Sequence, residues 1–563
     1  MQGAAPAQRQ PPSPCLRRHG IANRNTRRQG RSLPTQPGQH VTTSTEVELK
    51  FLVPPSAWAA IAAEMARGHA TLVRTTLAAM YLDTDDRRLA RAGMAWRLRR
   101  EGRPWVQALK AGGANALERF EHEVIRPDAT HDASVHAGTP VGDSLIALLR
   151  QARADGVELR VRFQTQVRRT SRRVRTRGAV VEIALDVGRL MSSDATAQIR
   201  EIEFELVSGS AVAMLALVER WRRRFGLIYD PRSKAERGDR LADGSPFPPV
   251  RKAALPDYAG KAGALAAFGA VVDECLSQIM RNAIGLAEGD PAQRVEHVHQ
   301  LRVGIRRLRS ALRSFRGWVP VPPQPLVAGL RDLFATLGTA RDGDVLAKGV
   351  AAELARVGAP ALALPSAAAA ADPVAAVRSD DAQRMFLAWI TWSATLASCL
   401  EADDDTAAVE MSDRIAQAGG DDIGDAVPSA RDHAPSFHQH AARRLRRWHA
   451  RIMADRAAFD ALDEAGLHAL RKRIKRQRYA VEFFAPGLRR RAVERYLTTL
   501  AELQERMGLL NDLFVARARY QALVATDPAA WFALGWLTAR IAAERALTKP
   551  ALIRLSKVDP PPR

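Results

Sequence analysis

Residues 46–50 read Glu-Val-Glu-Leu-Lys, and this stretch decides how the first half of the chain is expected to fold. Its charged side chains alternate with Val47 and Leu49, which predicts a β-strand with one ionic and one apolar face. Taken alone, such a strand usually turns its polar side to solvent. Five strands with mixed acidic and basic clusters on one face favour a shared ionic interior instead. The four further segments with this alternation are 96–99, 119–123, 182–186 and 201–205.

Short alternating segments separated by turn signals continue from residue 41 to about residue 241. We expect strands at 46–52, 95–100, 105–110, 119–125, 160–169, 179–187 and 199–207, with helices at 57–67, 142–151 and 211–225. This many strands predicts an antiparallel sandwich or a closed barrel. If the sheet closes, its apolar faces pack outward and its charges line a lumen. Such a lumen can hold a divalent cation on carboxylates and phosphate oxygens on Arg and Lys.

The composition limits the classes of protein that fit. The chain has 563 residues, of which 46% are hydrophobic, so it contains ample material for folded domains. Its net charge of +23 favours polyanionic partners, namely nucleic acid, anionic lipid or polyphosphate. The three cysteines lie far apart without a CxxC pair, which predicts no disulfide framework or zinc site and makes a reducing, cytoplasmic location the expectation. No apolar run is long enough to predict a membrane span.

Changes of composition mark the expected domains. Residues 1–40 lack Asp and Glu and are expected to form a disordered basic tail. A strand-rich domain at 41–245 is followed by a proline-bearing linker at 246–260. Long segments of period 3.6 then predict an all-helical region at 261–547, with a tail at 548–563. The expected fold class is α+β multidomain, with an N-terminal antiparallel sandwich or β-barrel followed by C-terminal helical bundles.

An internal repeat divides the helical region. The sequence His-Gln-Leu-Arg at 299–302 matches His-Ala-Leu-Arg at 468–471, which predicts two homologous bundles at about 261–358 and 380–547. A basic stripe on a helix is usually just a solvated face. These stripes, however, have almost no acidic partners at i+4, so a bound polyanion would relieve their repulsion. The stripe residues are His299, Arg302, Arg306, Arg309, Arg313, His468, Arg471, Lys472, Lys475 and Arg478.

Several motifs of the first half resemble those of the CYTH domain, which has the triphosphate tunnel metalloenzyme fold, and they occur in the family's order. They lie at 46–50, 96–99, 106–110, 201–205 and 233–238. The resemblance implies an eight-stranded antiparallel barrel. The repeats that begin at His299 and His468 resemble the CHAD domain, a helical module associated with binding of inorganic polyphosphate.

The CYTH resemblance implies metal-dependent hydrolysis of a triphosphate, with tripolyphosphate split into pyrophosphate and phosphate, and Mg²⁺ or Mn²⁺ as cofactor. The residues at metal-ligand positions are Glu46, Glu48, Glu203 and Glu205. The residues at phosphate-binding positions are Lys50, Arg97, Arg99, Lys110, Arg119, Arg169 and Lys234, and the implied catalytic residues are Glu46, Glu48 and Lys50. The remaining lumen positions have no assigned role and are Glu121, Glu123, Glu182 and Asp186.

The leading hypothesis is a cytoplasmic inorganic triphosphatase whose helical module holds polyphosphate. The main alternative is a non-catalytic scaffold that binds polyphosphate or storage granules. A third interpretation keeps the barrel but gives it adenylyl cyclase or thiamine triphosphatase chemistry. Nucleic acid is disfavoured as a partner, because the basic stripes carry no interleaved aromatic side chains for base stacking.

Overall fold

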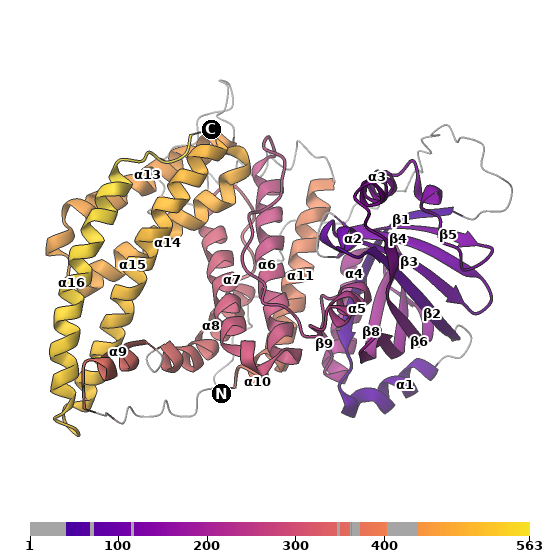
Figure 1. Cartoon of the computed structure of the whole chain (residues 1–563), viewed down its shortest axis with the longest axis horizontal. Coiled ribbons are helices and arrows are strands. Elements are labelled where there is room, and N and C mark those ends of the chain that lie inside the picture. Colours follow the sequence, from indigo (N-terminus) through magenta and orange to yellow (C-terminus); the bar gives the residue numbers. More distant parts are fainter. Residues whose placement is uncertain are drawn as a thin grey trace, which may run out of the picture. The chain divides into compact units, whose positions relative to one another are not determined.

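The computed structural model describes residues 41–67, 72–113, 117–345, 349–360, 362, 372–401 and 437–562. The basic tail expected at 1–40 lies outside these ranges. Within them, strands form the first part of the chain and long helices the second (Figure 1). The predicted α+β class, with a barrel followed by helices, is therefore confirmed.

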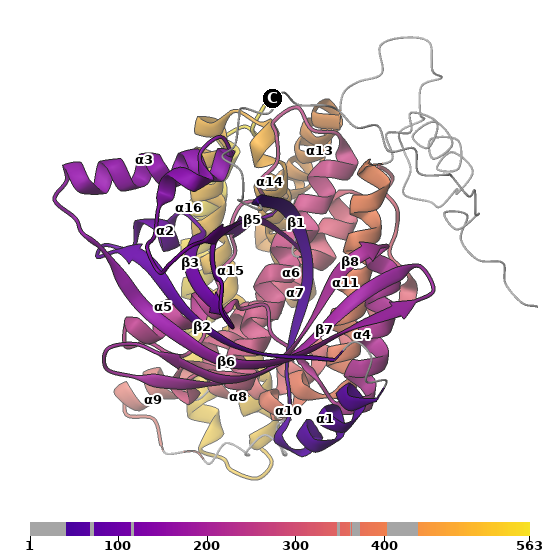
Figure 2. The same cartoon turned by 90° about the vertical axis from the view of Figure 1, so that its right-hand side faces the viewer.

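Eight antiparallel strands curve around a common centre and close into a barrel (Figure 2). Their order is β5-β4-β3-β2-β6-β7-β8-β1, and β1 also pairs with β5, which closes the ring. A short strand, β9 (Ile228–Tyr229), extends the pairing at the end of β1. The eight strands are β1 (Val41–Leu52), β2 (Val73–Thr84), β3 (Met94–Glu101), β4 (Trp105–Gly112), β5 (Glu118–Arg126), β6 (Leu159–Thr176), β7 (Ala179–Met191) and β8 (Thr196–Gly209).

The alternation in the sequence sets the two faces of the barrel wall. In β1, Leu49 and Phe51 lie on the outer face and are fully buried in an apolar cluster with side chains of the helix α4 (Ala211–Phe225). The ring of Phe204 connects the two elements, because its centroid is 5.9 Å from Phe51 and 5.9 Å from Trp221 of α4. Burial of each such side chain contributes about 1.5–3 kcal/mol. The apolar face thus fixes α4 on the outside and leaves the charged face for the interior.

Short helices complete the barrel domain, and three of them lie where the sequence predicted helices. These three are α1 (Trp58–Ala66), α3 (Pro140–Ala154) and α4, whereas α2 (Arg88–Arg91) and α5 (Lys234–Ala242) were not expected. Strand β2 was also missed, because apolar side chains stand on both of its faces and no polar–apolar alternation marks it. A signal for α5 exists in the sequence: Ser233 accepts a hydrogen bond from the Glu236 N–H, the N-terminal half of a capping box.

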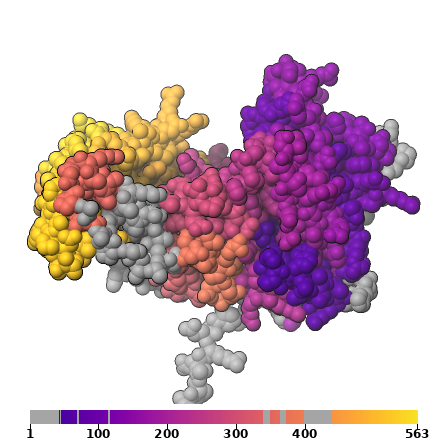
Figure 3. Space-filling view, turned by 60° about the horizontal axis from the view of Figure 1, so that its bottom comes forward, coloured from indigo at the N-terminus to yellow at the C-terminus, as the bar shows by residue number. Residues whose placement is uncertain are grey.

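The second region is built from helices. They are α6 (Ala264–Glu288), α7 (Arg294–Ser314), α8 (Gln324–Val345), α9 (Ala351–Arg356), α10 (Pro373–Arg378), α11 (Asp380–Glu401), α13 (Phe437–Ala457), α14 (Glu464–Phe484), α15 (Arg490–Leu523) and α16 (Ala530–Ser556). Helix α16 runs beyond 547, the expected end of the domain, because Leu552 and Leu555 are buried in the core. Helix α9 lies against α16, where Arg540 Nε is 3.6 Å from Glu353 Oε2 (Figure 3).

The internal repeat places α7 and α14 in equivalent positions. Their apolar sides are anchored alike, since Ile305 and Ile474 are both fully buried. The two helices are joined directly, because Arg307 Nη1 donates to Glu482 Oε2 at 2.7 Å in a buried ion pair. The basic sides of α7 and α14 therefore belong to one surface.

Among the described helices, none combines the length and the apolar composition that crossing a membrane requires.

Candidate active site and a basic groove

The barrel surrounds a cavity of about 770 Å³. The structure brings to this cavity almost every charged residue that the sequence placed on the ionic strand faces. They are Glu46, Glu48, Lys50, Arg97, Arg99, Lys110, Arg119, Glu121, Glu123, Arg169, Glu182, Asp186, Glu203, Glu205 and Lys234. All except Lys234, which begins α5, come from strands. The shared lumen thus exists in the structure, while the chemical role of each residue stays a prediction.

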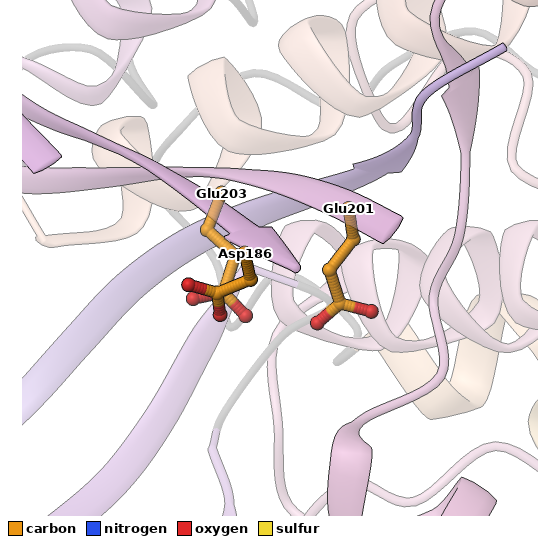
Figure 4. Close-up of side chains that lie close together, drawn as sticks. All are labelled: Asp186, Glu201 and Glu203. Atoms are coloured by element: carbon orange, nitrogen blue, oxygen red, sulfur yellow. The ribbon is translucent and has the colours of Figure 1, made fainter. Parts of the chain in front are cut away.

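Three carboxylates from the neighbouring strands β7 and β8 lie close together (Figure 4). Ligand oxygens of Asp186, Glu201 and Glu203 all lie within 4.8 Å of one another, a spacing that suits a cation. The ammonium of Lys234 occupies that position, with its Nζ 2.7 Å from Asp186, 2.5 Å from Glu201 and 2.7 Å from Glu203. Arg169 also pairs with Asp186 and Glu203, and Arg237 pairs with Glu201, so three side-chain cations already balance the three carboxylates.

The charge states of the cluster follow from its neighbours. Burial by itself lowers the pKa of Lys234, but Asp186, Glu201 and Glu203 raise that pKa well above its ordinary value. Burial likewise raises the pKa of Glu203, but Lys234 and Arg169 bring it well below the ordinary range. Both groups are thus charged at neutral pH, and the cluster is a buried network of ion pairs.

Glu205 lies among negative charges, in contrast to Glu203, which lies among cations. It faces Glu48 across β1 and Glu182 across β7, so carboxylates flank it on both sides. Burial and then the negative charge of Glu46 raise the pKa of Glu205 to about 7. Within the described part of the chain Glu205 forms no ion pair. The negative charges around Glu205 favour an oxygen-liganded divalent cation. Among the described residues, however, the carboxylates already at ligand spacing are Asp186, Glu201 and Glu203, which include only Glu203 of the four predicted metal ligands.

Neighbouring cations hold Glu46 and Glu48 in place. Lys110 Nζ is 2.7 Å from Glu46 Oε2 and also 2.8 Å from Glu121 Oε1. Arg119 Nη1 donates to Glu48 Oε1 at 3.1 Å. These pairs fix the direction of two carboxylates that stand next to Glu205 and so preorganise the acidic part of the cavity.

Another part of the cavity holds the guanidinium groups of Arg97 and Arg99, which are paired with carboxylates of β3 and β5. Arg97 Nη2 donates to Glu123 Oε1 at 3.1 Å, while burial and then Arg97 lower the pKa of Arg99. Lys50 lies elsewhere in the cavity, opposite Glu203 of β8; it is 3% exposed, and no ion pair to it exists among the described residues. Buried cations without full compensation attract an anion, and guanidinium groups match phosphate oxygens in geometry.

Some residues of the cavity were not expected from the sequence. Asp239 of α5 pairs with Arg87 and lies 3.6 Å from Arg162 Nη2 of β6, so it ties the helix to the barrel. Arg281 also lines the cavity although it belongs to α6 of the helical region. No local sequence signal predicts Arg281, because only the tertiary structure brings it to the barrel.

The predicted basic stripes line a second cavity of about 980 Å³ between α7 and α14. All ten predicted stripe residues take part in it, and Lys252, Arg307 and Arg476 add to its positive charge. Among the described lining residues, the carboxylates are Glu482 and Asp512. We call this cavity the basic groove. Its two sides come from the two halves of the repeat, as the sequence predicted.

Some side chains of the basic groove also support the bundle. Arg302 Nη1 donates to the Leu337 carbonyl of α8 at 3.1 Å, and its guanidinium lies 4.6 Å from the ring centroid of Phe334. On the opposite side, His468 Nδ1 is 3.0 Å from Asn511 Oδ1 of α15. Arg478 Nε donates to Glu482 Oε1 at 3.1 Å, so part of the second stripe is paired within the protein.

A closed barrel with a mixed ionic cavity, followed by paired helical bundles with a basic groove, defines a protein of two functional domains. Comparison with known families names both. Residues 44–238 match the CYTH domain and residues 270–521 match the CHAD domain. The chain belongs to the proteins in which a CYTH domain is followed by a CHAD domain.

Individual relatives are more distant. An inorganic triphosphatase from Haemophilus influenzae is 26% identical over 200 residues, which are 34% of this chain and 54% of that protein. The chain thus spans about half the length of that relative. The crystal structure of the CHAD domain from Ricinus communis matches 56% of this chain and 98% of its own, with 28% identity and a TM-score of 0.36. A Hippeastrum protein described as a putative adenylyl cyclase with a dominant triphosphatase activity matches 36% of this chain and 98% of its own, with 17% identity and a TM-score of 0.27.

Proposed function

We propose that the barrel hydrolyses inorganic triphosphate, with Mg²⁺ or Mn²⁺ as its cofactor. The observation that carries this proposal is a single cavity in which, among the described residues, one carboxylate (Glu205) and one ammonium (Lys50) form no ion pair, while the guanidinium groups of Arg97 and Arg99 face the same cavity. A metal–triphosphate complex has the complementary arrangement of charge. The CYTH match and the triphosphatase relative support hydrolysis of triphosphates in general.

Each side chain has a role in this proposal. Glu46, Glu48 and Glu205, together with Glu203, hold the metal, which when bound withdraws charge from phosphate oxygens. Lys110 and Arg119 keep the acidic side chains in position while they also face the substrate. The phosphate chain is bound by Lys50, Arg97, Arg99, Arg169 and Lys234. Water adds to one phosphorus atom and a bridging P–O bond breaks, and these cations stabilise the charge that develops on the oxygens.

The test is phosphate release from tripolyphosphate by the full chain, with each metal and with a chelator. We expect turnover only with a divalent metal, and a loss of at least about 10²-fold in Glu46→Gln and Glu48→Gln. Glu64→Gln is the matched control, because Glu64 lies in α1 outside the cavity. Parallel assays with ATP and thiamine triphosphate identify the preferred triphosphate. Absence of hydrolysis by folded protein, or full activity in Glu46→Gln, contradicts the proposal.

We further propose that the basic groove binds linear inorganic polyphosphate. Supporting this, cations from two helices face one cavity and outnumber its carboxylates among the described residues. Polyphosphate has one negative charge or more per phosphate along a flexible chain, so it follows such a groove without base-specific contacts. Calorimetric titration with polyphosphate and with DNA at matched salt tests this assignment. Equal affinity for both polymers contradicts it, and binding without any cleavage of tripolyphosphate supports a scaffold instead of an enzyme.

A further inference from the structure

The segment that carries Lys234 is fixed on its inner side by the barrel. Arg237 Nη1 of α5 is 2.7 Å from Glu201 Oε2, and Asp239 pairs with Arg87. Gly238 lies so close to β6 that a Cβ atom there would stand 2.1 Å from the ring of Phe163. These contacts set the distance of α5 from the barrel wall but leave the outer side of its first turn free for other partners.

That outer side is held by the helical region. Glu236 stands two residues after Lys234, and its Oε1 accepts a hydrogen bond from Arg281 Nη1 of α6 at 2.6 Å. Both residues line the barrel cavity with Lys234, and Pro249 of the linker lies there too. The helical region therefore supplies part of the wall of the cavity.

A second contact holds the same segment before Lys234. The Tyr229 N–H of β9 donates to Gln383 Oε1 of α11 at 2.9 Å, and Gln383 is itself fixed because its Nε2 donates to the Val377 carbonyl at 2.7 Å. Gln383 is 4% exposed, so this contact is inside the protein. Residues 229–236 are thus held at both ends by the helical region, with Lys234 between the two contacts.

We propose that Arg281 and Gln383 are positioning residues for the barrel cavity. They fix residues 229–236 so that the Lys234 ammonium lies among Asp186, Glu201 and Glu203. The inference rests on the proposed triphosphate hydrolysis and adds that substrate binding in the barrel depends on the helical region. The effect acts through α5, because Arg281 is bonded to Glu236, which stands two residues after Lys234 in that helix. Misplacement of a binding group by about 1 Å is enough to change catalysis strongly.

The experiment compares Arg281→Gln, Arg281→Lys and wild type in the full chain. We expect Arg281→Gln to raise the KM for tripolyphosphate about fivefold with little change in kcat. Arg281→Lys keeps the positive charge, so its KM should stay close to that of wild type. Amide hydrogen exchange in residues 233–242 should become faster in Arg281→Gln. Arg378→Gln is the control, because it removes an ion pair to α6 that lies outside the barrel cavity, the one between Arg378 and Glu288.

A double-mutant cycle separates positioning from direct contact with substrate. If Arg281 acts through Glu236, Arg281→Gln has no further effect on KM in a Glu236→Gln background. An effect that persists in that background, or an unchanged KM and exchange rate in Arg281→Gln, overturns the inference. Wild type without turnover instead overturns the proposed hydrolysis, and the exchange rates of residues 233–242 then decide the positioning role alone.

Discussion

The barrel cavity and the basic groove are both rich in Arg and Lys, yet they differ in what balances that charge. Among the described residues, the barrel cavity is lined by twelve carboxylates and eleven Lys or Arg side chains. The basic groove is lined by eleven Lys or Arg side chains and two carboxylates. The barrel cavity thus balances its charges internally, whereas the groove has an excess of positive charge that the proposed polyanion would neutralise.

Removing a cation should therefore lower the free energy of unfolding in the barrel but not in the groove. The largest effect is expected for Lys234→Met. It leaves Asp186, Glu201 and Glu203 without their ammonium, which should cost about 3–5 kcal/mol of unfolding free energy. Urea denaturation measures this loss. Because the carboxylate spacing suits a cation, Mn²⁺ should restore part of the stability. A variant as stable as wild type without metal would show that the cluster is not the buried ion-pair network described.

In the basic groove, replacement of several cations should weaken binding and leave the fold intact. For the triple variant Arg306→Gln, Arg309→Gln and Arg313→Gln, we expect the slope of log affinity against log salt to fall by about 2–3 for polyphosphate. Isothermal titration at several salt concentrations measures the slope. Tripolyphosphate turnover serves as the control and should not change, since these residues line the groove and not the barrel cavity. An unchanged slope would show that polyphosphate does not bind at these three residues of the basic groove.

The acidic part of the barrel predicts a pH dependence that the groove does not share. The pKa of Glu205 is raised to about 7 in the folded protein, so the folded state binds this proton more tightly than the unfolded chain. The resulting stability is fully present below the ordinary carboxyl pKa of 4.5 and is lost as the pH rises to about 7. Without metal, Glu205→Gln should therefore raise the melting temperature at pH 8 and have little effect at pH 4.5.

Mg²⁺ or Mn²⁺ provides the second half of this experiment. Metal should stabilise wild type more than Glu205→Gln at pH 8, because the ion replaces the proton as the partner of the carboxylate. Parallel profiles of melting temperature against pH for the two proteins would contradict the raised pKa of Glu205. If metal raises the melting temperature of both proteins equally, Glu205 is not a metal ligand.

The smallest expected effect concerns repulsion within the groove. Burial and then Arg313 and Arg331 lower the pKa of Arg309, so this guanidinium lies in positive surroundings. Arg309 and Arg313 are four residues apart on α7, and Arg309→Gln should increase the unfolding free energy by about 0.2–0.5 kcal/mol. Urea denaturation at low salt detects this gain, which should vanish in high salt and in an Arg313→Gln background. A loss of stability would mean that Arg309 supports the bundle.

The sequence predicted much of this architecture because charge alternation with period two in five strands indicates a shared ionic face, and the resemblance to the CYTH domain implied that the sheet closes around that face. It also predicted both sides of the groove, because the repeat was visible at His299 and His468. Strand β2 was missed since its side chains are apolar on both faces, which removes the alternation. Arg302 was expected only as a phosphate ligand, and its bond to the Leu337 carbonyl depends on how α8 packs. Arg281 could not be predicted for the same reason, because a contact between domains leaves no local pattern.

Strand β1 has a consequence for synthesis of the protein. It pairs with β5 and with β8, and the partner of Glu48 is Glu205, so the strand leaves the ribosome about 150 residues before its ring can close. At ordinary translation rates this delay is on the order of ten seconds. During that time, an unpaired apolar strand would pair with strands of other nascent chains. In residues 46–50 every second side chain is ionic, which disfavours such pairing. The charges expected to bind phosphate should thus also disfavour aggregation of the newly made strand.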